Sequence, residues 1–198
     1  PGAPLEDVLA QLAQTLPAEP FRLIGYSMGA RVALAFTLAR PERVQQLTLI
    51  GATAGLTDAA ARAQRCEDDG ALADRITALG AEAFDRAWRE HPLIRTQDRL
   101  PEPFLSELRA RRCRQPTDRL LGHLTHLSAA VIPSMWPDLH RITCDVELVS
   151  GSEDAKYTRL ARKLAEWIEG ATVTVVDGAG HAPHLEADDL SWLSLRRP

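Results

Sequence analysis

The sequence of 198 residues has little lysine, little cysteine and no long apolar run, and each shortage excludes a class of protein. Only two of its 23 basic residues are lysine, and 27 acidic residues bring the formal net charge to −4 at pH 7. Nucleic-acid-binding proteins carry a clear basic excess, so no nucleic-acid partner is expected. No apolar stretch approaches the roughly 20 residues that a membrane-spanning helix needs, so no membrane partner is expected either.

The three cysteines, Cys66, Cys113 and Cys144, are too far apart to form a Cys-x-x-Cys pair. Neither a zinc knuckle nor a dithiol redox centre is therefore predicted, and we expect no metal and no cofactor. An odd number of scattered cysteines is typical of a reducing compartment, so the predicted location is the cytoplasm. A chain of this length buries about 70% of its unfolded surface and needs no disulfide to hold its core.

Short apolar runs separated by helical patterns predict an α/β fold at both ends of the chain. Phe21–Gly25 and Val44–Ile50 have the composition of strands, and the apolar segment Met28–Ala39 between them is typical of a buried helix. A strand, a helix and a second strand within about 30 residues indicate a right-handed parallel unit. A similar pattern returns near the C-terminus, as a strand, a helix, a strand and a closing helix: Val146–Ser150, Arg159–Ile168, Val173–Val176 and Leu185–Leu195.

The middle of the chain has no strand-like run and predicts a helical insertion of roughly 80 residues. Five prolines separate short amphipathic segments there, and the predicted helices are Thr57–Asp69, Ala81–Glu90, Glu102–Arg112 and Thr117–Ala130. We therefore expect three parts. Residues 1–55 are the first part of the α/β core, residues 56–136 are a helical cap, and residues 137–198 are the second part of the core.

Residues 25–29 match the pattern G-x-S-x-G, with a predicted strand directly before it and a predicted helix directly after it. In that setting the pattern is typical of a nucleophile elbow, a sharp turn that lifts the serine hydroxyl, here of Ser27, clear of the sheet. We expect strained backbone angles at Ser27. We also expect glycine to be required at Gly25 and Gly29, because a Cβ at either position would collide across the turn. The Met28 amide, at the start of the helix, is free to donate to a developing oxyanion.

A serine nucleophile needs a base and an acid that orients the base, which on this architecture follow in the chain order serine, acid, histidine. Asp154 lies in a turn after one predicted strand, and His181 follows a glycine-rich turn after the next. These two residues complete the predicted triad with Ser27. Two acids and one histidine stay open as alternatives for these roles: Glu153, Asp177 and His184.

With these motifs the sequence resembles the α/β-hydrolase superfamily over essentially its whole length. It resembles one branch more closely, the 2-succinyl-6-hydroxy-2,4-cyclohexadiene-1-carboxylate synthases, which are lyases of menaquinone biosynthesis. The stretches that carry this closer resemblance are Gly25–Arg31, Gly51–Arg65, Phe84–Trp88, Gly151–Tyr157 and Gly178–His181. The triad motifs are shared by the whole superfamily, whereas the arginine and tryptophan positions of the cap point to the synthase branch.

The resemblance implies a lyase that eliminates pyruvate from a cyclohexene carrying an enolpyruvyl ether and a succinyl group, with the triad serine acting chiefly as a base. Because this substrate bears three carboxylates, guanidinium groups from separate elements would bind it bidentately. The residues that match the branch at substrate-binding positions are Tyr26, Arg31, Arg65, Trp88 and Arg112. The expected partner is therefore a small polycarboxylate. A simpler interpretation stays open for these residues. The arginines could be solvated residues on helix surfaces, and the tryptophan could serve only to pack the cap.

One departure from the superfamily concerns the region before Phe21. Members carry about four further strands there, and a loop that supplies the second oxyanion donor. Here a single predicted helix precedes the elbow, so we expect an N-terminally truncated copy of the enzyme with half of the oxyanion hole. Two other functions stay open: a Ser-His-Asp hydrolase of small esters or carbon–carbon bonds, and a non-catalytic domain that kept the fold.

Overall fold

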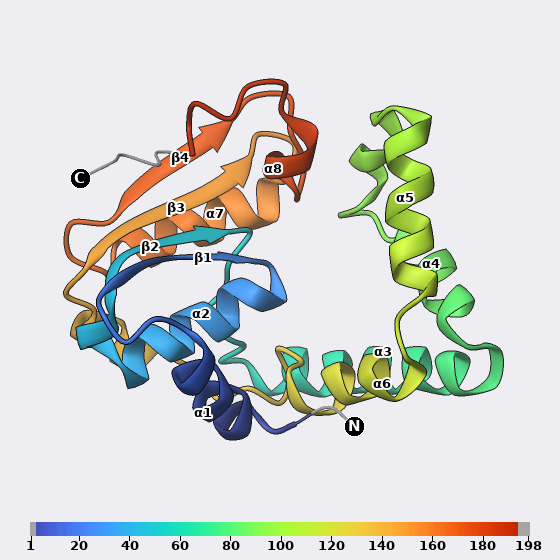
Figure 1. Ribbon diagram of the computed structural model, residues 1–198, viewed down its shortest axis with the longest axis horizontal. Coiled ribbons are helices and arrows are strands. Elements are labelled where there is room, and N and C mark those ends of the chain that lie inside the picture. The colour runs from blue at the N-terminus through green and yellow to red at the C-terminus, as the bar shows by residue number, and fades with distance from the viewer. Residues whose placement is uncertain (1–2, 194–198) are drawn as a thin grey trace.

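A four-stranded parallel sheet forms the framework of the α/β part of the computed structural model, which describes residues 3–193 (Figure 1). The strands lie in the sheet in chain order: β1 (Phe21–Tyr26), β2 (Val44–Ile50), β3 (Asp145–Gly151) and β4 (Thr172–Val176). Every neighbouring pair among them is parallel. The predicted α/β fold is confirmed, and each predicted strand is correct to within one residue at either end.

Helices connect the parallel strands, because a parallel pair needs a crossover. The helices of this α/β part are α1 (Leu5–Thr15), α2 (Met28–Ala39), α7 (Ala155–Ala165) and α8 (Pro183–Glu186), with a short 3-10 helix, η1 (Pro41–Arg43). α2 links β1 to β2, and α7 links β3 to β4. α7 begins four residues before the predicted start at Arg159, because the Asp154 carboxylate accepts a hydrogen bond from the Tyr157 amide and caps the helix.

The strand directions bring three turns to one edge of the sheet. The register pairs the last residues of β1 with those of β2, and the last residues of β3 with those of β4. The turns after β1, β3 and β4 therefore open at the same edge, and they carry Ser27, Asp154 and His181 respectively. Figure 1 shows the strand arrows pointing towards the side of the molecule where α4 and α5 stand.

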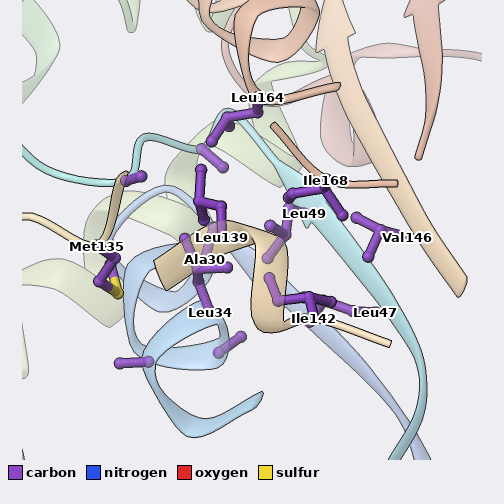
Figure 2. Close-up of a cluster of buried hydrophobic side chains, with 14 of the residues drawn as sticks. Ala30, Leu34, Leu47, Leu49, Met135, Leu139, Ile142, Val146, Leu164 and Ile168 are labelled. Carbon is purple, nitrogen blue, oxygen red and sulfur yellow. The ribbon is translucent and has the colours of Figure 1, made fainter. Parts of the chain in front are cut away.

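The main core lies where α2, α7 and a 3-10 helix, η3 (Trp136–Arg141), pack on the sheet. Figure 2 shows the side chains that meet there, among them Ala30, Leu34, Leu47, Leu49, Leu139, Ile142, Val146 and Leu164. Leu34, Leu47 and Leu164 expose none of their surface. Each fully buried leucine contributes about 1.5–3 kcal/mol to folding. Because β1 and α2 both belong to this core, the turn between them has a rigid base.

A helical insertion separates β2 from β3. It contains α3 (Ala59–Leu79), α4 (Ala81–Glu90), the 3-10 helix η2 (Arg95–Arg99), α5 (Glu102–Cys113) and α6 (Thr117–His126). A small core of its own, built around Ile76, Ala81 and Leu120, holds α3, α4 and α6 together. The predicted insertion is confirmed, although α3 runs ten residues beyond the predicted end at Asp69. The boundaries at residues 55/56 and 136/137 stay predictions.

The predicted closing helix, Leu185–Leu195, is wrong over its described residues. The only helix of this segment within residues 3–193 is α8, which ends at Glu186, and Ala187 is extended. Asp189 then accepts hydrogen bonds from the amide and the hydroxyl of Ser191. Such a local side-chain turn competes with helix formation. Residues 194 and 195 of the predicted helix lie outside the described residues.

None of the helices within residues 3–193 combines the length and the apolar character that crossing a bilayer requires.

Candidate active site

Ser27 lies at a strained turn between β1 and α2. Its φ is +52° and its ψ is −110°, and among the described residues it is the one residue other than glycine with a positive φ. Such a conformation costs about 1–3 kcal/mol and persists only where surrounding structure imposes it. A Cβ at Gly25 would lie 2.6 Å from both the Ala30 Cα and the Gly29 carbonyl oxygen, so glycine is required there. The predicted elbow geometry is confirmed.

The expectation for Gly29 is wrong. A Cβ placed on Gly29 meets no atom within 4 Å outside its own stretch of helix. Gly29 is the second residue of α2 and is exposed, so sterics alone do not require glycine. A close steric requirement appears instead at Gly51, after β2, where φ is +58° and a Cβ would lie 2.7 Å from the His181 Cε1 atom.

The structure brings Ser27, Asp154 and His181 into one hydrogen-bonded chain. The Nε2 atom of His181 lies 3.0 Å from the Ser27 Oγ atom, and its Nδ1 atom lies 2.7 Å from Asp154 Oδ2. The side chains of Asp154 and His181 are each only 2% exposed. The second oxygen of Asp154 accepts a hydrogen bond from the Tyr157 amide, so both carboxylate oxygens have partners. This is the geometry that lets a histidine take a proton from a serine while a carboxylate orients the ring.

The alternatives for the acid and the base lie elsewhere. Glu153 forms an ion pair with Arg99. Asp177 accepts a hydrogen bond from the Ser152 hydroxyl, at 3.3 Å. His184 packs on the Tyr26 ring with 4.5 Å between ring centroids, and burial lowers the pKa of His184. Its buried Nδ1 atom has no hydrogen-bond partner among the described residues.

A carboxylate that the sequence analysis missed holds the turn around His181. Glu186, in α8, accepts hydrogen bonds from the backbone amides of the residues on both sides of His181: from Gly180 at 2.7 Å and from Ala182 at 3.0 Å. Hydrogen bonds to a charged acceptor are stronger than those between neutral groups. A glutamate five residues after a histidine is not a recognisable sequence motif, because the role of Glu186 depends on the path of the loop.

Two tyrosine rings pack against the imidazole of His181. The Tyr26 ring centroid lies 5.3 Å from it and the Tyr157 centroid 4.4 Å from it. Burial raises the pKa of both tyrosines above its ordinary value, so their hydroxyls stay protonated and can donate hydrogen bonds. Tyr26 was a predicted substrate-binding residue, whereas Tyr157 was not identified from the sequence as a site residue.

Arg31 is a buried cation that forms no ion pair with a carboxylate among the described residues. It lies one turn after Ser27 in α2 and is only 5% exposed. One terminal nitrogen donates to the Leu127 carbonyl oxygen at 3.1 Å, and the buried Nε atom finds no acceptor among the described residues. Burial lowers the pKa of the Arg31 guanidinium, and the charge of Arg65 adds to this, whereas the charge of Asp69 opposes it.

The two cap arginines, Arg65 and Arg112, each form an ion pair with a buried aspartate. The Nε atom of Arg65 lies 2.9 Å from both carboxylate oxygens of Asp69. Arg112 donates to Asp85 at 3.0 Å and to the side-chain oxygen of Gln97 at 3.2 Å. These partners fix the two guanidinium groups and leave other N–H groups of each arginine available, because a guanidinium has five donors.

The charges of the three arginines reach the tyrosines that flank His181. Burial is the main reason for the raised pKa of Tyr157, and the charges of Arg31 and Arg65 partly offset it. The charge of Arg112 likewise lowers the pKa of Tyr26, against burial and the charge of Glu186. The grouping of these three arginines, from α2, α3 and α5, around one substrate stays a prediction.

The remaining predicted residues are Met28 and Trp88. Met28 is the first residue of α2, where backbone amides have no intrahelical acceptor. Trp88 lies in α4 and packs within the cap, with its ring centroid 5.4 Å from that of Phe84 and 6.3 Å from that of His91. Within residues 3–193, no three or more histidine, cysteine, aspartate or glutamate side chains are grouped to hold a metal ion.

The fold and the strained serine turn agree with a family match that covers nearly the whole chain. Residues 2–191 match the model described as the alpha/beta hydrolase family, and the chain belongs to that family. The fold alone is also shared with an esterase from Thermogutta terrifontis, whose structure matches with a TM-score of 0.76 at 23% identity over 94% of this chain and 68% of that chain.

Within the family, the chain is similar to proteins named 2-succinyl-6-hydroxy-2,4-cyclohexadiene-1-carboxylate synthase. The one from Escherichia coli O1:K1 is 30% identical over 184 residues, which cover 91% of this chain and 70% of the relative. A Bacillus subtilis relative, assigned the same name provisionally, is 34% identical over 178 residues, or 90% of this chain. This chain spans 65% of that relative's length. The structure of MenH from S. aureus matches with a TM-score of 0.89 and 26% identity, over 93% of this chain and 70% of that chain.

Proposed function

We propose that the protein is a lyase that eliminates pyruvate from 2-succinyl-5-enolpyruvyl-6-hydroxy-3-cyclohexene-1-carboxylate, to give 2-succinyl-6-hydroxy-2,4-cyclohexadiene-1-carboxylate. The names of the similar synthases support this reaction. The single observation in the structure that carries it is the buried guanidinium of Arg31, which has an unpaired donor one turn from Ser27.

Burying the Arg31 guanidinium without an ion-pair partner costs free energy, and an anionic substrate would offset this cost. Removing a guanidinium from water costs several kcal/mol unless a counter-charge and hydrogen bonds replace the water. The Leu127 carbonyl supplies one neutral partner, and the charge of Asp69, whose carboxylate is already bound by Arg65 and Ser128, offsets only part of the cost. A substrate carboxylate would supply the missing charge and an acceptor for Nε, whereas a neutral ester would supply no charge. The burial of Arg31 therefore favours a polyanionic substrate over a simple ester.

In this mechanism Ser27 acts as a base rather than as a nucleophile. His181 takes the proton of the Ser27 hydroxyl through Nε2, and Asp154 stabilises the imidazolium that forms. The Ser27 oxygen removes the proton on ring carbon 2, and the electron pair forms a double bond between carbons 2 and 3. The original double bond between carbons 3 and 4 shifts to carbons 4 and 5 as the bond from carbon 5 to the enolpyruvyl oxygen breaks. The leaving enolate takes the proton held by the His181 imidazolium and becomes pyruvate, so that Ser27 and His181 return to their starting protonation states. No water is consumed.

Other residues bind the substrate and the charge that develops on it. The Met28 amide, at the positive end of α2, donates to developing negative charge. Arg31, Arg65 and Arg112 bind the three carboxylates, and the Tyr26 hydroxyl donates a further hydrogen bond. Trp88 supplies an apolar wall on the side of the cap. The partner in this proposal is thus a small polycarboxylate, bound between the sheet edge and the cap of residues 56–136.

The test is to give the protein the enolpyruvyl substrate and to measure pyruvate and the diene product together. Equal amounts of both, and a loss of at least about 10³-fold in Ser27→Ala, are the expected results. A short-chain p-nitrophenyl ester is the matched neutral substrate. Ready cleavage of this ester with no release of pyruvate would replace the proposal with a Ser-His-Asp hydrolase. No turnover of either substrate would favour a non-catalytic domain.

A further inference from the structure

The short 3-10 helix η2, which connects α4 to α5, contacts a cap arginine on one side and two loops of the α/β core on the other. On the cap side, its Gln97 is only 5% exposed and accepts a hydrogen bond from Arg112 at 3.2 Å. Gln97 is one of two partners that hold Arg112, the other being Asp85. The position of η2 therefore helps to set the position of the Arg112 guanidinium.

On the core side, Arg99 of η2 binds the loop that carries Asp154. Its two terminal nitrogens bind the two carboxylate oxygens of Glu153, one of them at 2.8 Å. Glu153 directly precedes Asp154 in the chain. The Arg99 guanidinium holds the pKa of the Glu153 carboxyl below its ordinary value. A two-pronged pair of this kind fixes direction as well as distance.

η2 also contacts the loop that carries His181. Arg99 lies 3.5 Å from the Gly178 carbonyl oxygen. The side chain of Thr96 fills the space beside Gly180, where a Cβ would lie 2.1 Å from the Thr96 Oγ1 atom. Glycine at this position thus allows the cap to pack directly against the residue before His181.

We propose that η2 holds the Arg112 side of the substrate site in register with the Asp154–His181 pair, and that Arg99 and Glu153 are its positioning residues. The proposal rests on the proposed function for the role of Arg112, but the contact with the two core loops does not depend on the substrate. A carboxylate on Arg112 and a reacting carbon at Ser27 belong to one molecule. A small displacement of one site relative to the other therefore lowers the rate.

The test uses Arg99→Gln, Glu153→Gln and the exchanged pair Arg99→Glu with Glu153→Arg. The ion pair is partly exposed, with 59% and 38% of the two side chains accessible, so its effect is modest and screened by salt. Each single variant is expected to lower kcat/KM for the polycarboxylate by about fivefold, mainly through KM, and the exchanged pair to recover most of it. The matched control is Arg141→Gln, which breaks an equally exposed ion pair with Asp138 in η3.

A second measurement is independent of the substrate. The rate at which phenylmethylsulfonyl fluoride modifies Ser27 reports how well His181 is placed. This rate is expected to fall in both single variants and to return in the exchanged pair. Wild-type protein that releases no pyruvate would refute the proposed function and leave the labelling rates to decide the role of η2. Labelling rates in Arg99→Gln equal to those of wild type or of Arg141→Gln would overturn the role of η2.

Discussion

The ring of Tyr157 packs against the imidazole of His181, with 4.4 Å between ring centroids and 50° between ring planes. The amide of the same tyrosine donates a hydrogen bond to Asp154. One residue in the first turn of α7 therefore contacts both residues of the hydrogen-bonded chain that ends at Ser27. The other tyrosine of the chain, Tyr26, packs against the same imidazole, so two aromatic neighbours restrain the ring of His181.

We expect the ring of Tyr157, rather than its hydroxyl, to place His181. Tyr157→Phe keeps the ring and should keep kcat within about twofold, whereas Tyr157→Leu removes an aromatic contact worth about 1 kcal/mol and should lower kcat roughly fivefold. Steady-state kinetics on both variants, with thermal unfolding as a control for folding, checks this. Equal kcat values for Tyr157→Leu and wild type would contradict it.

Replacing Arg31 should separate stability from activity. In Arg31→Met an apolar side chain of similar length takes the place of a buried, incompletely paired cation, so we expect an equal or higher Tm. The same variant should lose roughly 10–100-fold in kcat/KM on the polycarboxylate, because a charge-assisted pair with the substrate is lost. Activity on a neutral ester should hardly change. Calorimetry and kinetics on the two substrates measure the three effects.

Arg31→Ala serves as the comparison for that experiment. It removes the same charge and leaves a cavity, so it should show the same loss of activity together with a lower Tm. Equal losses on the polycarboxylate and on the neutral ester would mean that Arg31 supports the fold of the site rather than the recognition of an anion.

Glu186→Gln should weaken the turn that holds His181. The amide of glutamine can accept only with its oxygen, and its NH2 group would face one of the two backbone amides that Glu186 now binds. Leaving such a donor unpaired costs about 1–3 kcal/mol, so we expect kcat to fall by roughly tenfold or more. The control is Glu166→Gln, at the exposed C-terminal end of α7, which should have no effect. The measurement is kcat of the Glu186→Gln variant and of wild type at several temperatures. Equal kcat values at all temperatures would refute this role of Glu186.

His184 should make the protein less stable at acidic pH. Burial lowers the pKa of His184, the charge of Glu186 opposes this, and His181 adds to it. Below the unfolded-state pKa of about 6.5, the unfolded chain binds a proton that the folded chain binds less readily. The contribution of neutral, buried His184 to the free energy of unfolding is therefore fully present above that pH and is lost as the pH falls below it. His184→Phe, which keeps a ring beside Tyr26, should make the free energy of unfolding depend less on pH between about 5 and 7.

Urea unfolding at a series of pH values measures this slope. Burial also lowers the pKa of His91 and of His123, so a smaller slope should persist in the variant. A slope identical to that of wild type would show that His184 does not contribute.

Much of the candidate site could be predicted from the sequence because its signals are local. The elbow at Ser27 needs a strand, a glycine and a helix within a few residues, and each leaves a pattern in composition and periodicity. The places of Asp154 and His181 follow from parallel strands whose carboxyl ends must meet at one edge. The same reasoning failed at Gly29, because whether a Cβ collides depends on its direction from the helix, which a pattern does not specify.

Contacts between residues far apart in the chain were decided only by the tertiary structure. Arg31 meets the carbonyl of Leu127 across 96 residues, and Arg99 meets Glu153 across 54. No local periodicity encodes such pairs, because they depend on how the cap packs against the sheet edge. The sequence by itself determined which residues can perform the chemistry, since strand and turn propensities act over short distances. The packing of the cap decided that Arg31 is buried beside Leu127 and that Asp69 and Asp85 hold Arg65 and Arg112.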